Sequence, residues 1–119
     1  MKTSKAYFNR FKKAFIEWQN RLGLTQYRID FLHESLKDGD STFYARAQIW
    51  EKEKFVKVWL TREIQSPEVD EGPESHALHE VLHLLIHRLT WIGEARYCME
   101  NEIDDEAESV VVRLEKVLQ

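Results

Sequence analysis

The interpretation of this chain starts from residues 75–89, which read Ser-His-Ala-Leu-His-Glu-Val-Leu-His-Leu-Leu-Ile-His-Arg-Leu. Apolar residues fall on nearly every side of the helix that this stretch would form, and such a helix is normally buried. Its histidines recur at spacings of three and four residues and therefore share one stripe: His76, His79, His83 and His87. Because several buried histidines on one helix are costly without partners, the stripe indicates a binding site.

His79 and His83 stand one helical turn apart, with about 5–6 Å between their β-carbons. Both imidazoles can therefore bind one zinc ion at a zinc–nitrogen distance of about 2.0–2.1 Å. Glu80 follows the first histidine, so it points beside the metal and can take a proton from a bound water. This H-E-x-x-H pattern predicts Zn²⁺ held by His79 and His83, with Glu80 as the catalytic base.

A catalytic zinc site needs a third protein ligand and an open fourth position. Ile86 and Leu89 stand where the metzincin pattern requires glycine and histidine, so we expect an acidic ligand from a later helix instead. If that helix buries Val110, Glu106 lies at the edge of its buried face, and we favour it as the third ligand. The alternatives are Glu102, Asp105 and His76. His87 is open to three roles: orienting a ligand, donating to an oxyanion, or packing in the core.

The residues before the motif predict a helix and three strands. Phe8, Phe11, Phe15 and Trp18 form the apolar stripe of a helix from near Ser4 to near Leu22, and Gly23 suits its left-handed C-terminus. Alternating apolar residues then predict strands over residues 27–32, 43–50 and 55–60, the last two joined as an antiparallel hairpin. Between the first two strands, residues 37–40 are predicted to form a turn.

Two helices complete the predicted domain. Pro73 is expected to open the motif helix after an acidic loop over residues 63–74, and residues 90–99 are expected to form a connection. A last helix is predicted from about Asn101. Its inward stripe is expected to comprise Ala107, Val110, Val111, Leu114, Val117 and Leu118. The prediction is one α+β domain over residues 1–119, with a three-stranded, mostly antiparallel sheet, a buried motif helix and a C-terminal helix.

Composition narrows the functional classes. Of the 119 residues 43% are hydrophobic and 32% charged, as in ordinary globular domains. Cys98 is the only cysteine, which excludes cysteine-based zinc sites and fits a reducing compartment. The sequence has no run of about 18 apolar residues that would span a membrane, so we expect a cytoplasmic protein. The net charge of −4 makes nucleic acid an unlikely partner, and the basic N-terminal residues are interpreted as the solvated face of the first helix.

The order of elements and the stretch His79-Glu80-Val81-Leu82-His83 together resemble the zincin metallopeptidases. The resemblance is to minimal forms, namely SprT-like domains and small phage- or prophage-encoded H-E-x-x-H proteins. It implies zinc bound by His79 and His83, Glu80 as base, and, as in gluzincin-type members, a glutamate from the following helix that maps to Glu106. It also implies an extended peptide bound along the edge strand at residues 43–50.

These expectations describe a zinc-dependent metallopeptidase that hydrolyses peptide bonds. The alternative is a catalytically inactive, metal-binding regulatory or interaction module on the same fold. A closed site with a fourth protein ligand would indicate this alternative, whereas three ligands would indicate catalysis. A domain of this size leaves little room for a specificity pocket, which leaves a role for an adaptor protein in substrate selection.

Overall fold

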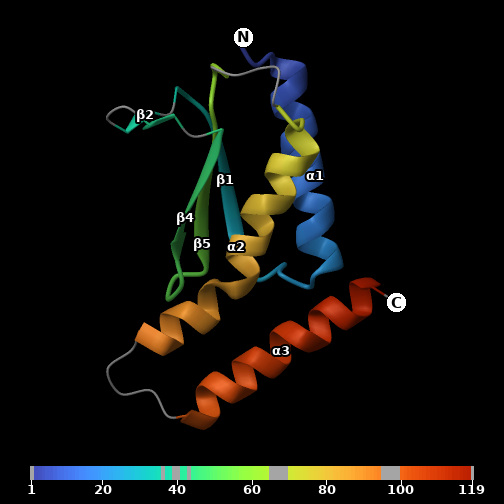
Figure 1. Cartoon of the computed structure of the whole chain (residues 1–119), viewed down its shortest axis with the longest axis vertical. Helices are drawn as coiled ribbons and strands as arrows, with labels where there is room; N and C mark the ends of the chain where they lie inside the picture. Colours follow the sequence, from blue (N-terminus) through green and yellow to red (C-terminus); the bar gives the residue numbers. More distant parts are fainter. Residues whose placement is uncertain are drawn as a thin grey trace.

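A computed structural model describes residues 2–35, 37–38, 41–42, 44–64, 70–94 and 100–118 (Figure 1). Along the chain the elements are α1 (Lys5–Arg21), β1 (Arg28–His33), β2 (Lys37–Asp38), β3 (Ser41–Thr42), β4 (Ala45–Trp50), β5 (Phe55–Leu60), α2 (Pro73–Glu94) and α3 (Glu100–Leu118). The fold is α+β, as predicted. Figure 1 shows α1 and α2 beside the sheet and α3 running beneath them.

Helix α1 has the predicted extent because its ends are capped. The Ser4 hydroxyl accepts a hydrogen bond from the Tyr7 main-chain N–H at 3.0 Å, which satisfies one unpaired donor of the first turn. At the other end Gly23 adopts φ +69°, the left-handed conformation that a side chain would disfavour. Between the caps, Phe11 and Phe15 are completely buried.

The main sheet has the strand order β1-β5-β4, so β5 lies in the centre and β4 forms an edge. β4 and β5 pair antiparallel, which confirms the predicted hairpin, whereas β1 pairs parallel with β5. The sheet is therefore mixed, with one pairing of each kind. Ala45 opens β4, two residues after the predicted start, and Phe43 lies outside the described residues. β2 occupies the first half of the turn predicted over residues 37–40 and pairs antiparallel with β3, which follows that turn. Residues 39–40 lie outside the described residues.

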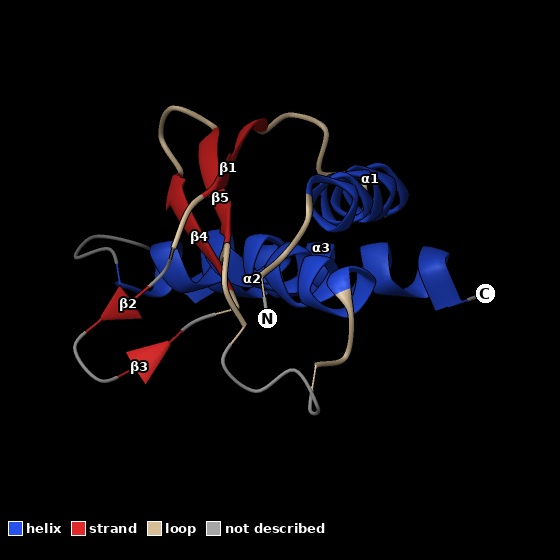
Figure 2. Cartoon of the chain, turned by 90° about the horizontal axis from the view of Figure 1, so that it is seen from above, coloured by secondary structure: helices blue, strands red, loops and turns tan. Residues whose placement is uncertain are grey.

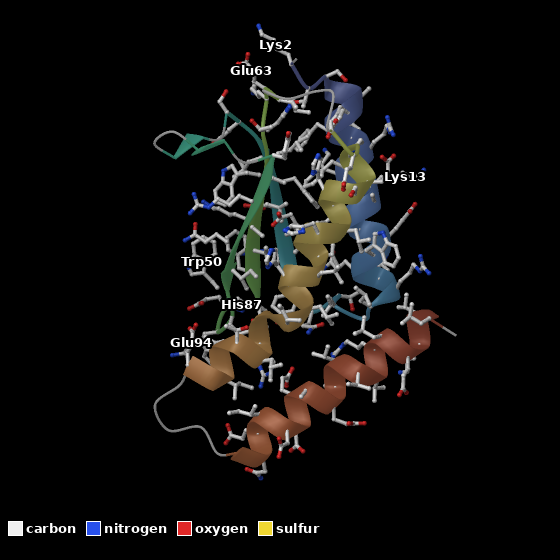
Figure 3. All side chains as sticks on the ribbon, viewed as in Figure 1. Lys2, Lys13, Trp50, Glu63, His87 and Glu94 are labelled. Atoms are coloured by element: carbon white, nitrogen blue, oxygen red, sulfur yellow. The ribbon has the colours of Figure 1, made fainter. Side chains whose placement is uncertain are left out.

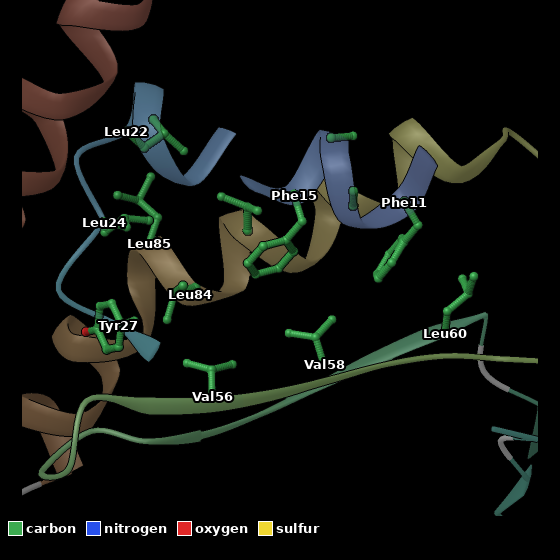
Figure 4. Close-up of a cluster of buried hydrophobic side chains, with 13 residues drawn as sticks. Phe11, Phe15, Leu22, Leu24, Tyr27, Val56, Val58, Leu60, Leu84 and Leu85 are labelled. Carbon is green, nitrogen blue, oxygen red and sulfur yellow. The ribbon is translucent and has the colours of Figure 1, made fainter. Parts of the chain in front are cut away.

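Helices α1 and α2 cover one face of this sheet (Figures 2 and 4). Val56, Val58 and Leu60 alternate along β5 and point into the core, where each is completely buried. Phe15 from α1 and Leu84 from α2 meet them there. The alternation leaves Phe55, Lys57 and Trp59 on the other face of the sheet.

Helix α2 begins at Pro73, as predicted, but it is buried on one side only. Ala77, Val81 and Leu84 are buried, whereas Leu82 and Ile86 are exposed, which corrects the expectation of a helix covered all round. The physical reason is that α2 contacts α1, β4 and α3, and these elements leave part of its circumference open. Nor does the helix end before residue 90: it continues to Glu94 because Ile92 is still buried, and residues 95–99 lie outside the described residues.

Helix α3 begins one residue before the predicted start. Ala107, Val110, Leu114 and Val117 are partly buried, as the predicted stripe requires. Val111 and Leu118 are exposed, so the real stripe is narrower than predicted. The reason is that α3 packs against α2 along one line rather than into a groove between two elements. None of the described helices is long and apolar enough to cross a membrane.

Candidate metal centre

The histidine pair, His79 and His83, lies on the exposed side of α2 with both rings turned toward each other. Their Nε2 atoms are 3.1 Å apart and their ring planes are inclined at 79°. Two nitrogens bound tetrahedrally to one zinc ion at about 2.0–2.1 Å are separated by about 3.3 Å. The two nitrogens are therefore separated by close to the distance between two zinc ligands, and at this distance one ring can also donate a hydrogen bond to the other.

Glu80 is buried next to this pair. Only 6% of the Glu80 surface is exposed, whereas His79 and His83 are both exposed. Burial raises the pKa of the Glu80 carboxyl above its ordinary value, and the nearby His83 and His79 oppose the shift. In the described parts of the chain, burial and these two histidines account for the shift, and no hydrogen bond contributes to it. A raised pKa makes this carboxylate a stronger base than an ordinary glutamate.

The histidine pair and Glu80 face a groove between β4 and α2, with a volume of about 450 Å³. Ala45, Arg46, Ala47 and Ile49 form its strand side. A second hollow of about 330 Å³ adjoins it through Ala45, His79 and Glu80 and extends toward Tyr44 and Ser75. We call the two together the β4–α2 groove.

Among the described strands none pairs with the outer edge of β4, and this edge borders the groove. The Thr61 main-chain N–H donates to the Tyr44 carbonyl at 2.9 Å, so Tyr44 and every second residue after it pair with β5. Antiparallel strands alternate in this way, and the main-chain groups of Ala45, Ala47 and Ile49 therefore point away from β5. An extended peptide could add to the sheet along these three residues.

His76, the histidine alternative for the third ligand, is already engaged. Its Nε2–H donates to Asp70 Oδ1 at 2.6 Å, and its ring stacks on Tyr44 at a centroid distance of 4.9 Å. Asp70 also accepts from the Tyr7 hydroxyl at 2.8 Å. Burial alone would raise the pKa of the Asp70 carboxyl, but the hydrogen bonds from His76 and Tyr7 outweigh it and lower the pKa. His76 therefore flanks the histidine pair without joining it.

His87 flanks the pair on the other side and belongs to what we call the Glu51 network: Glu51, Tyr27, Lys54, His87 and Arg88. The Glu51 side chain is 1% exposed and accepts from Tyr27 Oη at 2.7 Å, Lys54 Nζ at 2.6 Å and His87 Nδ1 at 3.1 Å. Burial alone would raise the pKa of the Glu51 carboxyl, but the hydrogen bonds from Lys54, Tyr27 and His87 outweigh it and lower the pKa. Figure 3 shows His87 near the hairpin end of the sheet.

Sequence reasoning missed Glu51. Glu51 follows the second predicted strand, and its partners Tyr27 and His87 lie 24 and 36 residues away along the chain. A local pattern contains no signal for such a network.

Glu106, the favoured third ligand, lies elsewhere. Its Oε2 accepts from Arg88 Nε at 3.1 Å, and Arg88 Nη1 is 3.7 Å from Glu51 Oε1. Arg88 follows His83 by five residues, which turns it by about 140° around the helix from that histidine. The structure thus brings His79, Glu80 and His83 together but places Glu106 with the Glu51 network. The spacing of the apolar residues correctly predicted that Glu106 lies at the edge of the buried face of α3. It did not predict that Arg88 pairs with this carboxylate.

The remaining acidic alternatives, Glu102 and Asp105, are exposed on α3. In the part of the chain that the structure describes, no three His, Cys, Asp or Glu side chains gather as a group that could hold a metal ion. The described residues therefore fit two positions of a zinc site, and the third ligand stays a prediction. Cys98 lies outside the described residues.

No protein-family model, no curated protein and no solved structure matches this chain. The resemblance to zincin metallopeptidases therefore stays a prediction, which depends on the H-E-x-x-H stretch and the order of elements.

Proposed function

We propose that this chain is a cytoplasmic, zinc-dependent metallopeptidase. One observation carries the proposal: a buried Glu80, whose pKa burial raises, lies beside a histidine pair whose nitrogens have nearly the spacing of two zinc ligands. Zinc held there would act as a Lewis acid, lowering the pKa of water and polarising a peptide carbonyl.

The other parts of the reaction come from the chain itself. The edge of β4 holds an extended peptide through the main-chain groups of Ala45, Ala47 and Ile49. The carbonyl group of the peptide bond to be cleaved then lies over the β4–α2 groove. Glu80 lines the same groove, within reach of a water molecule between it and the histidine pair. Fixing peptide, water and base in one groove supplies the proximity on which hydrolysis depends.

Proton balance assigns two tasks to Glu80. As the water oxygen forms a bond to the carbonyl carbon, one water proton passes to the Glu80 carboxylate. When the carbon–nitrogen bond breaks, this proton passes to the leaving amine. Burial raises the pKa of Glu80, which makes its carboxylate a stronger base for the first transfer.

A second candidate is a metal-binding module without turnover. The position of Glu106 favours it, since this carboxylate is paired with Arg88 rather than gathered with the histidine pair. The two candidates differ in how many protein ligands the metal has: a closed shell of four is structural, and an open position is catalytic.

Metal content and peptide cleavage, measured on the same samples, test the proposal. We expect about one zinc per wild-type chain by elemental mass spectrometry, and none in His79→Ala. Glu80→Gln should keep its zinc and lose about 10²- to 10⁴-fold in the cleavage rate of a quenched fluorescent peptide library, because general-base catalysis contributes that much.

The matched control is Glu74→Gln. Glu74 lies on the same helix but is exposed and paired with Arg10 at 2.8 Å, so its variant should cleave like the wild type. Normal cleavage by Glu80→Gln would remove Glu80 from the reaction. A zinc-bound wild type that cleaves no peptide in the library would support the binding module instead.

A further inference from the structure

The face of the main sheet that points away from α1 and α2 carries an ordered lattice of side chains, which we call the outer sheet face. Strand register sets it out in three rows across β1, β5 and β4. The rows are Arg28, Phe55 and Trp50; Asp30, Lys57 and Gln48; and Leu32, Trp59 and Arg46. Figure 3 shows Trp50 on the side of the sheet away from α2.

In the first and third rows, a cation lies near an aromatic ring at the surface. Trp50 and Phe55 contact each other at a centroid distance of 5.4 Å. Arg28 lies 5.0 Å above the Phe55 ring, and Arg46 lies 6.0 Å above the Trp59 ring. These rings are only partly buried, so they remain at the surface instead of joining the core.

The charge of the outer sheet face is opposite to that of the whole chain. Its charged members are three cations, Arg28, Arg46 and Lys57, and one carboxylate, Asp30. The chain as a whole carries −4. Three of the chain's 17 lysines and arginines thus lie among aromatic rings on one face, where an anion would meet them together with stacking surfaces.

We propose that the outer sheet face binds single-stranded nucleic acid. Unpaired bases offer flat π-surfaces that stack on aromatic rings and on guanidinium planes, and the phosphates between them pair with the cations. In a duplex the bases are paired and stacked on each other, so a duplex would contact the cations but not the aromatic rings. The first and third rows stand four residues apart, about 13 Å at ~3.3 Å per residue, which suits a few nucleotides.

This inference does not depend on the proposed peptidase. From β4 the groove is lined by Ala45, Arg46, Ala47 and Ile49, so Arg46 borders both surfaces, whereas Phe55, Lys57 and Trp59 of the central strand belong to the outer sheet face alone. The net charge of −4 made nucleic acid an unlikely partner. The sequence did not reveal this face, because its residues come from three different strands. Only strand register brings them together.

Fluorescence anisotropy with labelled dT15 and U15 tests the proposal on the full chain at 50 to 300 mM salt. We expect dissociation constants of about 1–100 µM at low salt, the range of sequence-independent binding. Three cations on single strands predict a salt slope of about −2 in log K against log salt. The variant Arg46→Gln should weaken binding and reduce the magnitude of this slope by about 0.7. Trp59→Ala should weaken binding about 5- to 100-fold, the usual range for one stacked base.

The chain supplies a matched control in Arg21, which lies 4.3 Å above the Trp18 ring on α1. Arg21→Gln removes the same kind of cation from the same kind of ring on another surface, and it should leave binding unchanged. Because Arg46 is exposed, Arg46→Gln tests the proposal even if Trp59→Ala fails to fold.

Several results would overturn the proposal. One is no binding of either oligonucleotide at 50 mM salt, and another is equal losses in Arg46→Gln and Arg21→Gln. Duplex DNA that binds as tightly as dT15 would show that phosphates alone are recognised. A dimer in sedimentation that Arg46→Gln dissociates would show that a second copy of the chain covers this face. None of these measurements uses zinc or peptide cleavage, so their failure leaves the proposed peptidase untouched.

Discussion

The substitution Glu51→Gln removes the charge at the centre of the Glu51 network while keeping its shape. The glutamine oxygen can still accept from Tyr27, but the amide cannot serve Lys54 and His87 as an anion does. Hydrogen bonds to a charged group contribute about 1.5–3 kcal/mol each when buried. The side chains of Lys54, His87 and Arg88 are 34%, 28% and 42% exposed, so water can partly replace their lost partner.

After this discount we expect the free energy of unfolding to fall by about 2 kcal/mol, rather than the ~3–5 kcal/mol of a fully buried ion pair. For a chain of 119 residues, 2 kcal/mol corresponds to a loss of about 8 °C in Tm. Circular dichroism during heating and in urea at pH 7 measures both quantities. Glu53→Gln is the control, because Glu53 lies in the same turn but is exposed, and its effect should stay within ~0.5 kcal/mol.

The pH dependence of the difference gives a second check. The pKa of Glu51 is lowered in the folded chain, so its ionised form stabilises the fold above the ordinary glutamate pKa of about 4.3. That contribution is lost as the pH falls through the lower, folded-state pKa. Glutamine does not titrate, so the wild type and Glu51→Gln should converge in stability as the pH falls below the ordinary glutamate pKa and through the lower folded-state pKa. Equal stabilities at pH 7, or a gap that persists unchanged in acid, would refute the reasoning.

Two further substitutions test the groove and the core. Ala47→Pro removes a main-chain N–H that points away from β5, so it should raise KM for peptides about fivefold, through loss of one hydrogen bond of ~1 kcal/mol, and leave the fold intact. Gln48→Pro, at the next position, removes an N–H paired with β5 and should unfold the edge strand. Peptidase kinetics and circular dichroism measure the effects of the two variants. Similar effects from Ala47→Pro and Gln48→Pro would contradict the assigned pairing. Phe15→Ala should lower the free energy of unfolding by about 3–5 kcal/mol in urea titrations, since Phe15 is completely buried and contacts Phe31 edge-on at 5.3 Å. Phe8→Ala, on the half-exposed side of α1, should cost much less, and an equal cost would show that the core is misassigned.

Local periodicity was enough to predict the motif helix, the hairpin and the grouping of His79, Glu80 and His83. Each depends on residues a few positions apart, where helix and strand geometry alone sets the distances. The left-handed Gly23 and the helix start at Pro73 are local in the same sense.

Features made by the packing of distant elements could not be predicted in this way. Glu106 has two competing neighbours on α2, and the rotation of α3 about its axis decides whether it meets Arg88 or the histidine pair. The parallel pairing of β1 with β5 likewise depends on where the chain re-enters the sheet. The aromatic and cationic lattice needed this register before Arg28, Phe55 and Trp50 could be seen as one row.

Asp70 binds His76 and Glu51 binds His87, so α2 is held on both sides of the histidine pair. Together the two contacts restrict rotation of the helix about its own axis. Side-chain tips travel on a radius of about 5–6 Å, so a roll of only 10° displaces His79 Nε2 by about 1 Å. A misplacement of that size can cost a catalyst about 100-fold in rate. The orientation of the site is thus set by two carboxylates that never touch it, one ahead of the helix and one in a hairpin turn.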